Sequence, residues 1–235
     1  MYKTKIDNLD LKQIADSGQC FRWKNTGENE YTVVAFDRAL RIKQDGNEFE
    51  LDCDEADWNN IWKSYLDMDT DYAGIAKLIA DGDDAHLKEA YAYGSGVRIL
   101  RQDLWEMIVT FLISQQNNIV RIRRCIKNIC ETYGTAKTAS NGVCYYAFPT
   151  AQALAGLEED ALMACNLGYR SKYVVRAAKA VSSGEVDLAW ISSLNYQKAR
   201  AELLKLFGVG EKVADCICLF ALHHLDVPWR PSDIE

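Results

Sequence analysis

Short runs of alternating hydrophobic and polar residues fill the first third of the chain. The last run places Phe49, Leu51 and Cys53 on one face and acidic residues on the other, a period of two that predicts a half-buried strand. Asp45-Gly46 stands before this run and is typical of a hairpin turn. The predicted strands are Tyr31–Phe36, Ala39–Lys43 and Glu48–Cys53.

From about Ala56 onward the spacing of apolar residues becomes helical. Asp103, with Glu106 three residues later, resembles a capping box and predicts a helix start. One buried stripe is expected from this helix, formed by Trp105, Ile108, Val109, Leu112 and Ile113. A second helix should turn inward Ile119, Ile122, Ile126 and Ile129.

Basic residues crowd the remaining positions of the second helix: Arg121, Arg123, Arg124 and Lys127. A solvated surface is the ordinary interpretation of such a run. The 235 residues carry a net charge of −7, but residues 1–94 hold 11 Lys/Arg against 20 Asp/Glu and residues 95–235 hold 16 against 14. Local charge matters more to phosphate than the sum, because attraction acts over about a Debye length. Charge alone therefore leaves a nucleic-acid partner open.

No repeat or long Gly/Ser/Pro linker separates the parts of the chain. We expect an α+β protein with a small antiparallel β domain at residues 1–94, packed on a helical domain at residues 95–235. No apolar run approaches the roughly 20 residues that span a bilayer, and the N-terminus lacks a signal-peptide core. The eight cysteines are scattered, which predicts reduced, buried thiols in a protein that is neither secreted nor membrane-bound.

The most informative segment is Leu203–Leu222. We predict a helix that ends at Phe207, a tight hairpin at Gly208-Val209-Gly210, and a second helix from about Glu211. Glycines permit positive φ and close backbone approach, so the hairpin can present N–H groups to a phosphate. A plain helical turn would look similar at GxG alone, whereas the longer apolar-GVG-x-K-x-A pattern is more specific for a helix–hairpin–helix DNA clamp.

Lys212 falls in the first turn of the second helix. A cation there opposes the helix dipole, and partial burial would also favour the neutral amine, which is a Schiff-base nucleophile. Cys216 lies one turn later on the same face and would line the same pocket. The alternatives are an ordinary surface lysine and a core cysteine. No Cys or His pair has zinc or iron–sulfur spacing, so we expect neither a metal nor another cofactor.

Several segments together resemble the 8-oxoguanine DNA glycosylases of the helix–hairpin–helix superfamily, in family order and over most of the chain. These segments are SGQCFRW (Ser17–Trp23), RQDLWEMIVTFLISQQNNIVRI (Arg101–Ile122), FPTAQALAG (Phe148–Gly156), NLGYRSKYV (Asn166–Val174) and FGVGEKVADCICLFAL (Phe207–Leu222).

The resemblance implies base-excision repair of oxidised guanine opposite cytosine in duplex DNA. It assigns Lys212 as the nucleophile on the sugar, followed by β-elimination, with Cys216 packed on the flipped base. It also implies that the backbone carbonyl of Gly18 accepts from the N7 hydrogen that oxidised guanine has and guanine lacks. Such a polar difference discriminates well, because a mismatch leaves a buried acceptor unpaired.

The same resemblance assigns residues to the DNA that remains after the base is extruded. Gln116 takes the place of an asparagine that fills the vacated stack, Tyr169 matches the wedge beside the lesion, and Arg121 and Arg170 correspond to arginines that hold the estranged cytosine. We expect a monomer, located at the nucleoid in a prokaryote or in the nucleus of a eukaryote.

The resemblance departs from the family pattern near the C-terminus. The family continues to P-V-D-x-H, whose Asp assists cleavage, and here Pro231 stands at that position, with Asp226 and Asp233 as nearby acids. We therefore expect a helical domain that is incomplete at its C-terminus and slow base removal by these residues. Two alternatives stay open: a non-catalytic damaged-DNA-binding remnant, and an alkylated-base glycosylase, which Lys212 argues against because such enzymes normally lack it.

Overall fold

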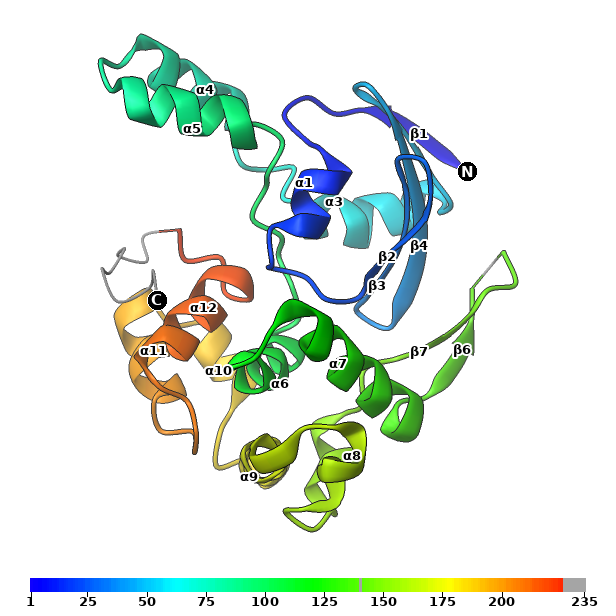
Figure 1. Cartoon of the computed structure of the whole chain (residues 1–235), viewed down its shortest axis with the longest axis vertical. Coiled ribbons are helices and arrows are strands. Elements are labelled where there is room, and N and C mark those ends of the chain that lie inside the picture. The colour runs from blue at the N-terminus through cyan, green and yellow to red at the C-terminus, as the bar shows by residue number, and fades with distance from the viewer. Residues whose placement is uncertain (140, 226–235) are drawn as a thin grey trace. The chain divides into compact units, whose positions relative to one another are not determined.

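The computed structural model describes residues 1–139 and 141–225, which form two compact units. The first, called here the sheet unit, comprises Met1–Val34, Arg38–Arg101 and Thr138–Val143. The second, the helical unit, takes in Ala35–Asp37, Gln102–Lys137 and the chain from Cys144 onward. The main boundary between the two units falls between Arg101 and Gln102. The sequence predicts this boundary between residues 94 and 95. The prediction of an α+β fold is confirmed (Figure 1).

The sheet unit is built on an antiparallel sheet that, in the described residues, has five strands in the order β1-β5-β4-β3-β2. Strands β2 to β5 follow one another in sequence, and β1 pairs with β5 at the edge. Side chains on the buried face alternate with half-exposed ones along β3, as a sheet with one face on the core requires. The strands are β1 (Tyr2–Lys5), β2 (Trp23–Gly27), β3 (Glu30–Ala35), β4 (Arg38–Asp45) and β5 (Glu48–Leu51).

The three predicted strands are present, with shifted ends. Phe49 and Leu51 are buried as the alternation predicts, but Cys53 lies beyond the end of β5. Gly46 has φ +61°, and Asp45 pairs with Glu48, so a two-residue turn joins β4 and β5 as expected. Strands β1 and β2 were not apparent from periodicity, because each is mostly exposed and carries too few apolar residues to show a period of two.

Helices also occur in the first third, which the sequence predicts to be β-rich. In α1 (Leu11–Asp16) the Asp10 side chain caps the helix by accepting from the Gln13 amide at 2.8 Å. Leu11 and Ile14 are buried. The predicted change to helical structure from about Ala56 is confirmed by α2 (Glu55–Asp57), a π-helical turn η1 (Trp58–Trp62) and α3 (Lys63–Tyr65).

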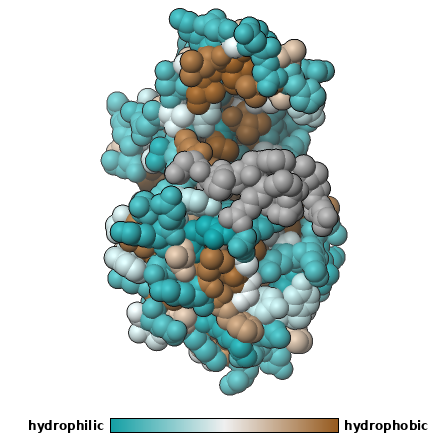
Figure 2. All heavy atoms as spheres, turned by 90° about the vertical axis from the view of Figure 1, so that its left-hand side faces the viewer, coloured by the Kyte–Doolittle hydropathy of each residue, from teal (hydrophilic) through white to brown (hydrophobic). Residues whose placement is uncertain are grey.

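The helices α4 (Tyr72–Asp81) and α5 (Ala85–Gly94) contain no buried residue. Ile75, Leu78 and Leu87 are exposed apolar side chains on this pair, and Figure 2 shows hydrophobic surface over this part of the molecule. The side chains of Asp71 and Asp84 cap the two helices by accepting from backbone amides at their starts.

The helical unit surrounds α6, whose residues Leu104–Ile113 are all buried. Phe111 of α6 stacks on Phe220 of α12 with ring centroids 5.7 Å apart. Its elements are α6 (Leu104–Ser114), α7 (Ile119–Tyr133), β6 (Ala136–Thr138), β7 (Cys144–Tyr146), α8 (Ala151–Ala155), η2 (Ala161–Cys165), η3 (Gly168–Arg170), α9 (Ser171–Ser182), α10 (Leu188–Ser192), α11 (Tyr196–Leu203) and α12 (Glu211–Phe220).

The predicted start of α6 is confirmed, because the Asp103 side chain accepts from the Glu106 amide at 2.8 Å. The predicted single stripe is too narrow, since α6 is covered on all sides by other helices. In α7, Ile122, Ile126 and Ile129 are buried as predicted, but Ile119 is 43% exposed. Ile119 is the first residue of α7, and no preceding turn of this helix covers it.

Most cysteines are buried, as predicted, but three are not. Cys144 is exposed on β7, and Cys53 and Cys216 are half-buried. The exposure of Cys144 follows from its place in a short two-stranded hairpin, where alternate side chains point to solvent.

Candidate active site

The chemically most suggestive cavity lies where the end of α6, the loop after it and the start of α12 meet. Its volume is about 630 Å³. Lys212 and Cys216 line it from α12, and Gln116 lines it from the loop. Residues that are 96 positions apart in the chain therefore share one cavity. The full lining is Phe111, Ser114, Gln115, Gln116, Asn117, Gly210, Glu211, Lys212, Val213 and Cys216.

Lys212 and Cys216 are one helical turn apart on α12, so both side chains face this cavity. The Lys212 side chain is exposed. Lys212 is therefore not partly buried, because it lies in the first turn of α12 at the mouth of the cavity. The half-buried Cys216 lies deeper along the helix. An amine at the mouth and an apolar thiol behind it suit a ligand that enters from solvent and is covered on one side.

The hairpin before α12 has the predicted tight geometry, but the first helix is shorter than expected. Helix α11 ends at Leu203 and not at Phe207, and the residues between them form turns. Gly208 has φ +92°, a conformation that favours glycine. Gly210 precedes α12 with no side-chain cap, and a Cβ placed there would meet nothing within 4 Å. The amides of the first turn of α12 thus lie at an uncrowded backbone surface.

The loop after α6 carries Gln116 in a left-handed conformation with φ +46°. Such a conformation is uncommon for a residue with a side chain and persists where the surroundings enforce it. Arg170 supplies the constraint. Its guanidinium donates to the carbonyls of both Gln115 and Gln116, the latter at 2.8 Å.

Arg170 is only 3% exposed. The sequence predicts contact between Arg170 and the estranged cytosine, but in this structure its donors are directed at the loop backbone. Gln115 extends the same network, because its side-chain amide donates to the Gly208 carbonyl at 3.0 Å. Sequence reasoning missed Gln115. Only the fold brings the Gly208 carbonyl, 93 residues away in the chain, within reach of its side chain.

Arg121 lies in the first turn of α7, where the Asn118 side chain caps the helix. The Arg121 guanidinium donates to the Asn166 carbonyl at 3.3 Å, and Asn166 has φ +69°. Tyr169 follows shortly after Asn166 and is 45% exposed, with the Arg170 guanidinium 4.5 Å from its ring centroid. Arg121 thus contacts the segment Asn166–Arg170, which contains Tyr169.

A buried acidic network ties α12 to α11. Asp215 is 7% exposed, and its Oδ1 accepts from the Tyr196 hydroxyl at 2.8 Å and from Arg200 Nε at 2.7 Å. Asp215 is the residue before Cys216 and the third after Lys212, so the network holds the helix that carries both. Sequence reasoning missed it, because only the fold brings Arg200 and Tyr196 to this carboxylate.

Gly18 belongs to the sheet unit, where it has φ +80° in the segment after α1. Next to it, Gln19 is buried, and its side chain donates to the Arg98 carbonyl and the Ser17 hydroxyl and accepts from the Leu100 amide. The local backbone at Gly18 is therefore well anchored. The predicted use of its carbonyl to read a base stays a prediction. Pro231, at the position of the family's aspartate, and the nearby acids Asp226 and Asp233 lie outside the described residues.

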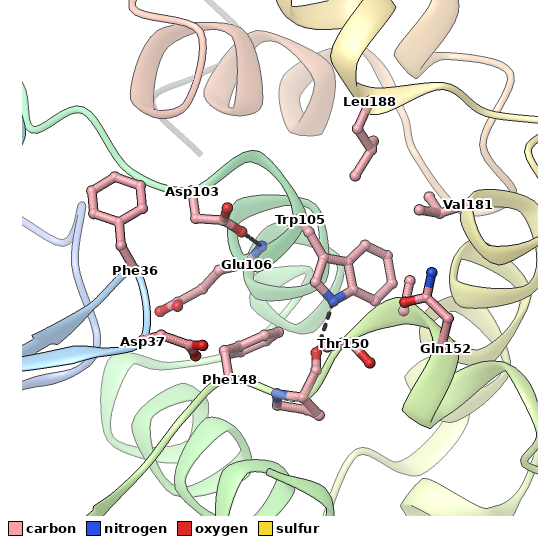
Figure 3. A pocket seen from close by; sticks show the side chains of 12 residues that line it. Phe36, Asp37, Asp103, Trp105, Glu106, Phe148, Thr150, Gln152, Val181 and Leu188 are labelled. Atoms are coloured by element: carbon pink, nitrogen blue, oxygen red, sulfur yellow. Dashed lines mark hydrogen bonds between the residues drawn. The ribbon is translucent and has the colours of Figure 1, made fainter. Parts of the chain in front are cut away.

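A second cavity, of about 510 Å³, lies beside the start of α6. Figure 3 shows Trp105 in its wall, with the indole N–H donating to the Pro149 carbonyl at 2.9 Å, and Asp103 capping α6. Phe148 and Thr150 also line it, and Thr150 caps α8. The segment Phe148–Gly156 thus connects helix α6 to helix α8, and these packing contacts account for its residues.

In the described part of the chain, no group of three or more His, Cys, Asp or Glu side chains is arranged to hold a metal ion. None of the described helices is long and apolar enough to cross a membrane.

Two family models match consecutive parts of the chain. Residues 1–108 match the N-terminal domain of 8-oxoguanine DNA glycosylase, and residues 109–222 match the HhH-GPD superfamily of base excision DNA repair proteins. Among curated proteins, the N-glycosylase/DNA lyase of Saccharomyces cerevisiae is 37% identical over 246 aligned positions, which cover 92% of this chain and 63% of the yeast protein. The N-glycosylase/DNA lyase OGG1 of Arabidopsis thaliana is 30% identical, and the match covers 94% of this chain and 63% of the plant protein. The chain thus spans about 63% of the length of these relatives.

Solved structures agree with the family models. The apo form of the Clostridium acetobutylicum 8-oxoguanine glycosylase/lyase superposes with a TM-score of 0.90 at 36% identity, covering 97% of this chain and 80% of that one. The same enzyme in complex with double-stranded DNA containing cytosine opposite 8-oxoG superposes with a TM-score of 0.90 at 34% identity. The match covers 98% of this chain and 82% of that one. Both units and their order are shared with these proteins, and the chain therefore belongs to the 8-oxoguanine DNA glycosylase family within the helix–hairpin–helix superfamily.

Proposed function

We propose that this protein is a base-excision repair DNA glycosylase with AP lyase activity, which acts as a monomer on 8-oxoguanine opposite cytosine in duplex DNA. One observation carries the proposal: Lys212, Cys216 and Gln116 line the same cavity beside the glycine hairpin. Family membership supports it, because relatives that align over nearly the whole chain are named N-glycosylase/DNA lyase.

In the proposed reaction the Nζ lone pair of neutral Lys212 attacks C1′ of the damaged nucleotide. The C1′–N9 bond breaks, its electron pair leaves with the base, and the base takes up a proton. The lysine nitrogen then loses a proton, and its lone pair forms a C1′=N bond as the C1′–O4′ bond breaks. O4′ takes up a proton, which leaves an open-chain sugar joined to the lysine as a protonated imine. Loss of a C2′ proton expels the 3′ phosphate by β-elimination. The exposed Lys212 side chain is accessible to an extruded nucleotide.

The hairpin supports binding of the DNA backbone. Its Val209 side chain is buried, so only the backbone of Gly208, Val209 and Gly210 is available to a phosphate, at the positive end of the α12 dipole. Such contacts position DNA without reading sequence. Affinity should therefore fall steeply with salt despite the net charge of −7.

We assign the recognition of the extruded base and its partner to four side chains and one carbonyl. Gln116 fills the vacated stack, Tyr169 wedges beside it, and Arg121 contacts the estranged cytosine. Arg170 contributes by holding the Gln116 loop, which its three bonds to the loop carbonyls support. Cys216 packs on the extruded base, and the Gly18 carbonyl accepts from its N7 hydrogen.

Borohydride trapping on a duplex with 8-oxoguanine opposite cytosine tests the nucleophile. The unchanged protein should form a covalent adduct, and Lys212→Gln should lose it while retaining DNA binding. Lys198→Gln is the matched control, since Lys198 is an exposed lysine of α11. Trapping by Lys212→Gln would show that another amine attacks. DNA binding without any trapping by the unchanged protein would favour the non-catalytic alternative.

Partner specificity is tested separately with Arg121→Ala. This change should reduce the preference for cytosine opposite the lesion more than it reduces overall affinity, because a base contact specifies and a phosphate contact only positions. An equal loss on damaged and undamaged duplexes would assign Arg121 to the backbone.

A further inference from the structure

Three aromatic side chains form a continuous row between the segment after η2 and the glycine hairpin. Tyr169 and Tyr173 have ring centroids 5.8 Å apart, and Tyr173 and Phe207 have centroids 5.4 Å apart. Tyr173 is half-buried in the middle, while Tyr169 and Phe207 are each 45% exposed. We call these three residues the aromatic row. Two large rings that remain almost half exposed on a folded surface call for an explanation.

A cation accompanies each ring of the row. The Arg170 guanidinium lies 4.5 Å from the Tyr169 centroid, Lys172 Nζ 5.6 Å from that of Tyr173, and the Arg176 guanidinium 4.2 Å from that of Phe207. Arg176 is also paired with Glu159, at 2.6 Å. Arg176 and Phe207 also line a cavity with the acidic residues Glu185, Asp187 and Glu202. The row therefore combines three rings with three cations, and acidic side chains lie at its Phe207 end.

The row also touches the hairpin backbone. A Cβ on Gly208 would approach the Tyr173 ring to 2.7 Å, so the glycine lies directly against the middle ring. The positive φ of Gly208 turns the chain at this point. Since Phe207 is the residue before Gly208, the exposed ring and the hairpin amides are parts of one surface.

We propose that the aromatic row is a DNA-contact surface, in which Phe207 packs against the deoxyribose next to the phosphate bound by the hairpin. Lys172 is the cation of the row assigned to a phosphate, because Arg170 is buried and bonded to the Gln116 loop and Arg176 is paired with Glu159. Exposed rings beside a lysine match a strand that alternates apolar sugar with anionic phosphate. Tyr173 is the positioning residue, because it contacts both exposed rings and the hairpin. The proposal rests on the DNA-binding function proposed above and adds Phe207, Tyr173 and Lys172 to the contact surface.

Binding to a duplex with a stable tetrahydrofuran abasic-site analogue, measured over a range of salt concentrations, tests the role of Phe207. Phe207→Ala should weaken binding about fivefold to tenfold and leave the salt slope unchanged, because the ring carries no charge. Lys172→Gln should lower the slope by about one, as loss of one phosphate contact does. Tyr93→Ala is the control, since Tyr93 is an 89% exposed ring of α5.

A double-mutant cycle tests the positioning role of Tyr173. Tyr173→Phe, which keeps the ring, should bind like the unchanged protein, whereas Tyr173→Leu should lose about as much affinity as Phe207→Ala. In the Tyr173→Leu background, adding Phe207→Ala should cost less than twofold, because the ring is already displaced. Thermal unfolding of each variant shows whether it is folded. Fully additive losses would overturn the positioning role, since independent sites add.

The outcomes separate this proposal from the function on which it rests. If the unchanged protein binds no duplex, the proposed function fails. If it binds and Phe207→Ala binds equally well, only the aromatic row fails as a contact surface. A loss of the same size in Tyr93→Ala would also overturn it, because any exposed ring would then have the same effect.

Discussion

The two units of the chain each contain a buried aspartate with the same pair of donors, a tyrosine hydroxyl and an arginine Nε. In the sheet unit, Asp67 is fully buried and accepts from the Tyr72 hydroxyl at 2.8 Å and from Arg101 Nε at 3.0 Å. In the helical unit, Asp215 accepts from its tyrosine and arginine partners at 2.8 and 2.7 Å. The local chemistry is the same, but the anchored elements differ.

Asp67 secures a turn. It has φ +50° after α3, and the Tyr72 hydroxyl that it binds also accepts from the Ile99 amide at 2.9 Å. Nearby, the buried Arg98 donates to the Asp67 carbonyl at 2.9 Å. This network joins the turn after α3 to the segment that ends the sheet unit, and it lines neither cavity described above. We therefore expect it to act on stability alone.

Asp215 secures a helix that carries chemistry. Its partners are on α11, and its own helix presents Lys212 and Cys216 to the cavity. A small rotation of α12 would move the lysine relative to the hairpin, and displacements of about 1 Å can cost a large factor in rate. We therefore expect the role of each buried ion pair to depend on the element that it holds.

The largest expected effect is the loss of stability in Asp67→Ala. Removing the carboxylate leaves a buried hydroxyl and a partly buried guanidinium without their acceptor, which should lower the free energy of unfolding by about 3 kcal/mol. Urea denaturation measures this, and borohydride trapping by the folded fraction should be unchanged. A stability loss below about 1 kcal/mol, or a trapping defect in folded protein, would break the comparison.

Asp215→Asn keeps the shape of the side chain and removes its charge. We expect the free energy of unfolding to fall by about 1–2 kcal/mol and the trapping rate to fall about tenfold, with a smaller change in DNA affinity. Asp67→Asn is the matched variant and should lose similar stability at an unchanged trapping rate. Equal trapping by the two variants would mean that Asp215, like Asp67, acts on stability alone.

Tyr196→Phe removes a single hydrogen bond from the Asp215 network and leaves the Arg200 ion pair in place. The expected loss is about 1 kcal/mol of stability, measured by urea denaturation, with a trapping defect smaller than that of Asp215→Asn. A trapping defect as large as that of Asp215→Asn would assign the positioning effect to the tyrosine and not to the charge.

The smallest expected effect is on pH dependence in the sheet unit. Burial, helped by the bond to Asp67, raises the pKa of Tyr72 to about 12. Because the folded state holds this proton more tightly than the unfolded chain, the contribution to stability is complete below pH 10 and is lost between pH 10 and 12. Tyr72→Phe should therefore lose stability less steeply than the unchanged protein over this range. Parallel curves in alkaline urea titrations would count against the shift.

Local patterns in the sequence were sufficient for several elements. The alternation at Phe49 and Leu51 predicted β5, Asp103 predicted the start of α6, and Gly208-Val209-Gly210 predicted the hairpin, because each depends on side chains within a few residues. The shared face of Lys212 and Cys216 followed from a four-residue helical spacing, and family resemblance supplied the identity of the site.

The tertiary structure alone decided what those residues contact. The family resemblance assigns Arg170 to a DNA contact. In the structure its side chain is buried and bonded to the loop of Gln116, which follows helix α6. Lys212 is exposed because nothing in the described fold covers the mouth of its cavity, and Ile119 because it precedes the covered part of α7. Burial and long-range hydrogen bonds depend on which distant segments pack together in the folded core. A local sequence pattern reports only on residues a few positions apart and therefore does not predict these contacts.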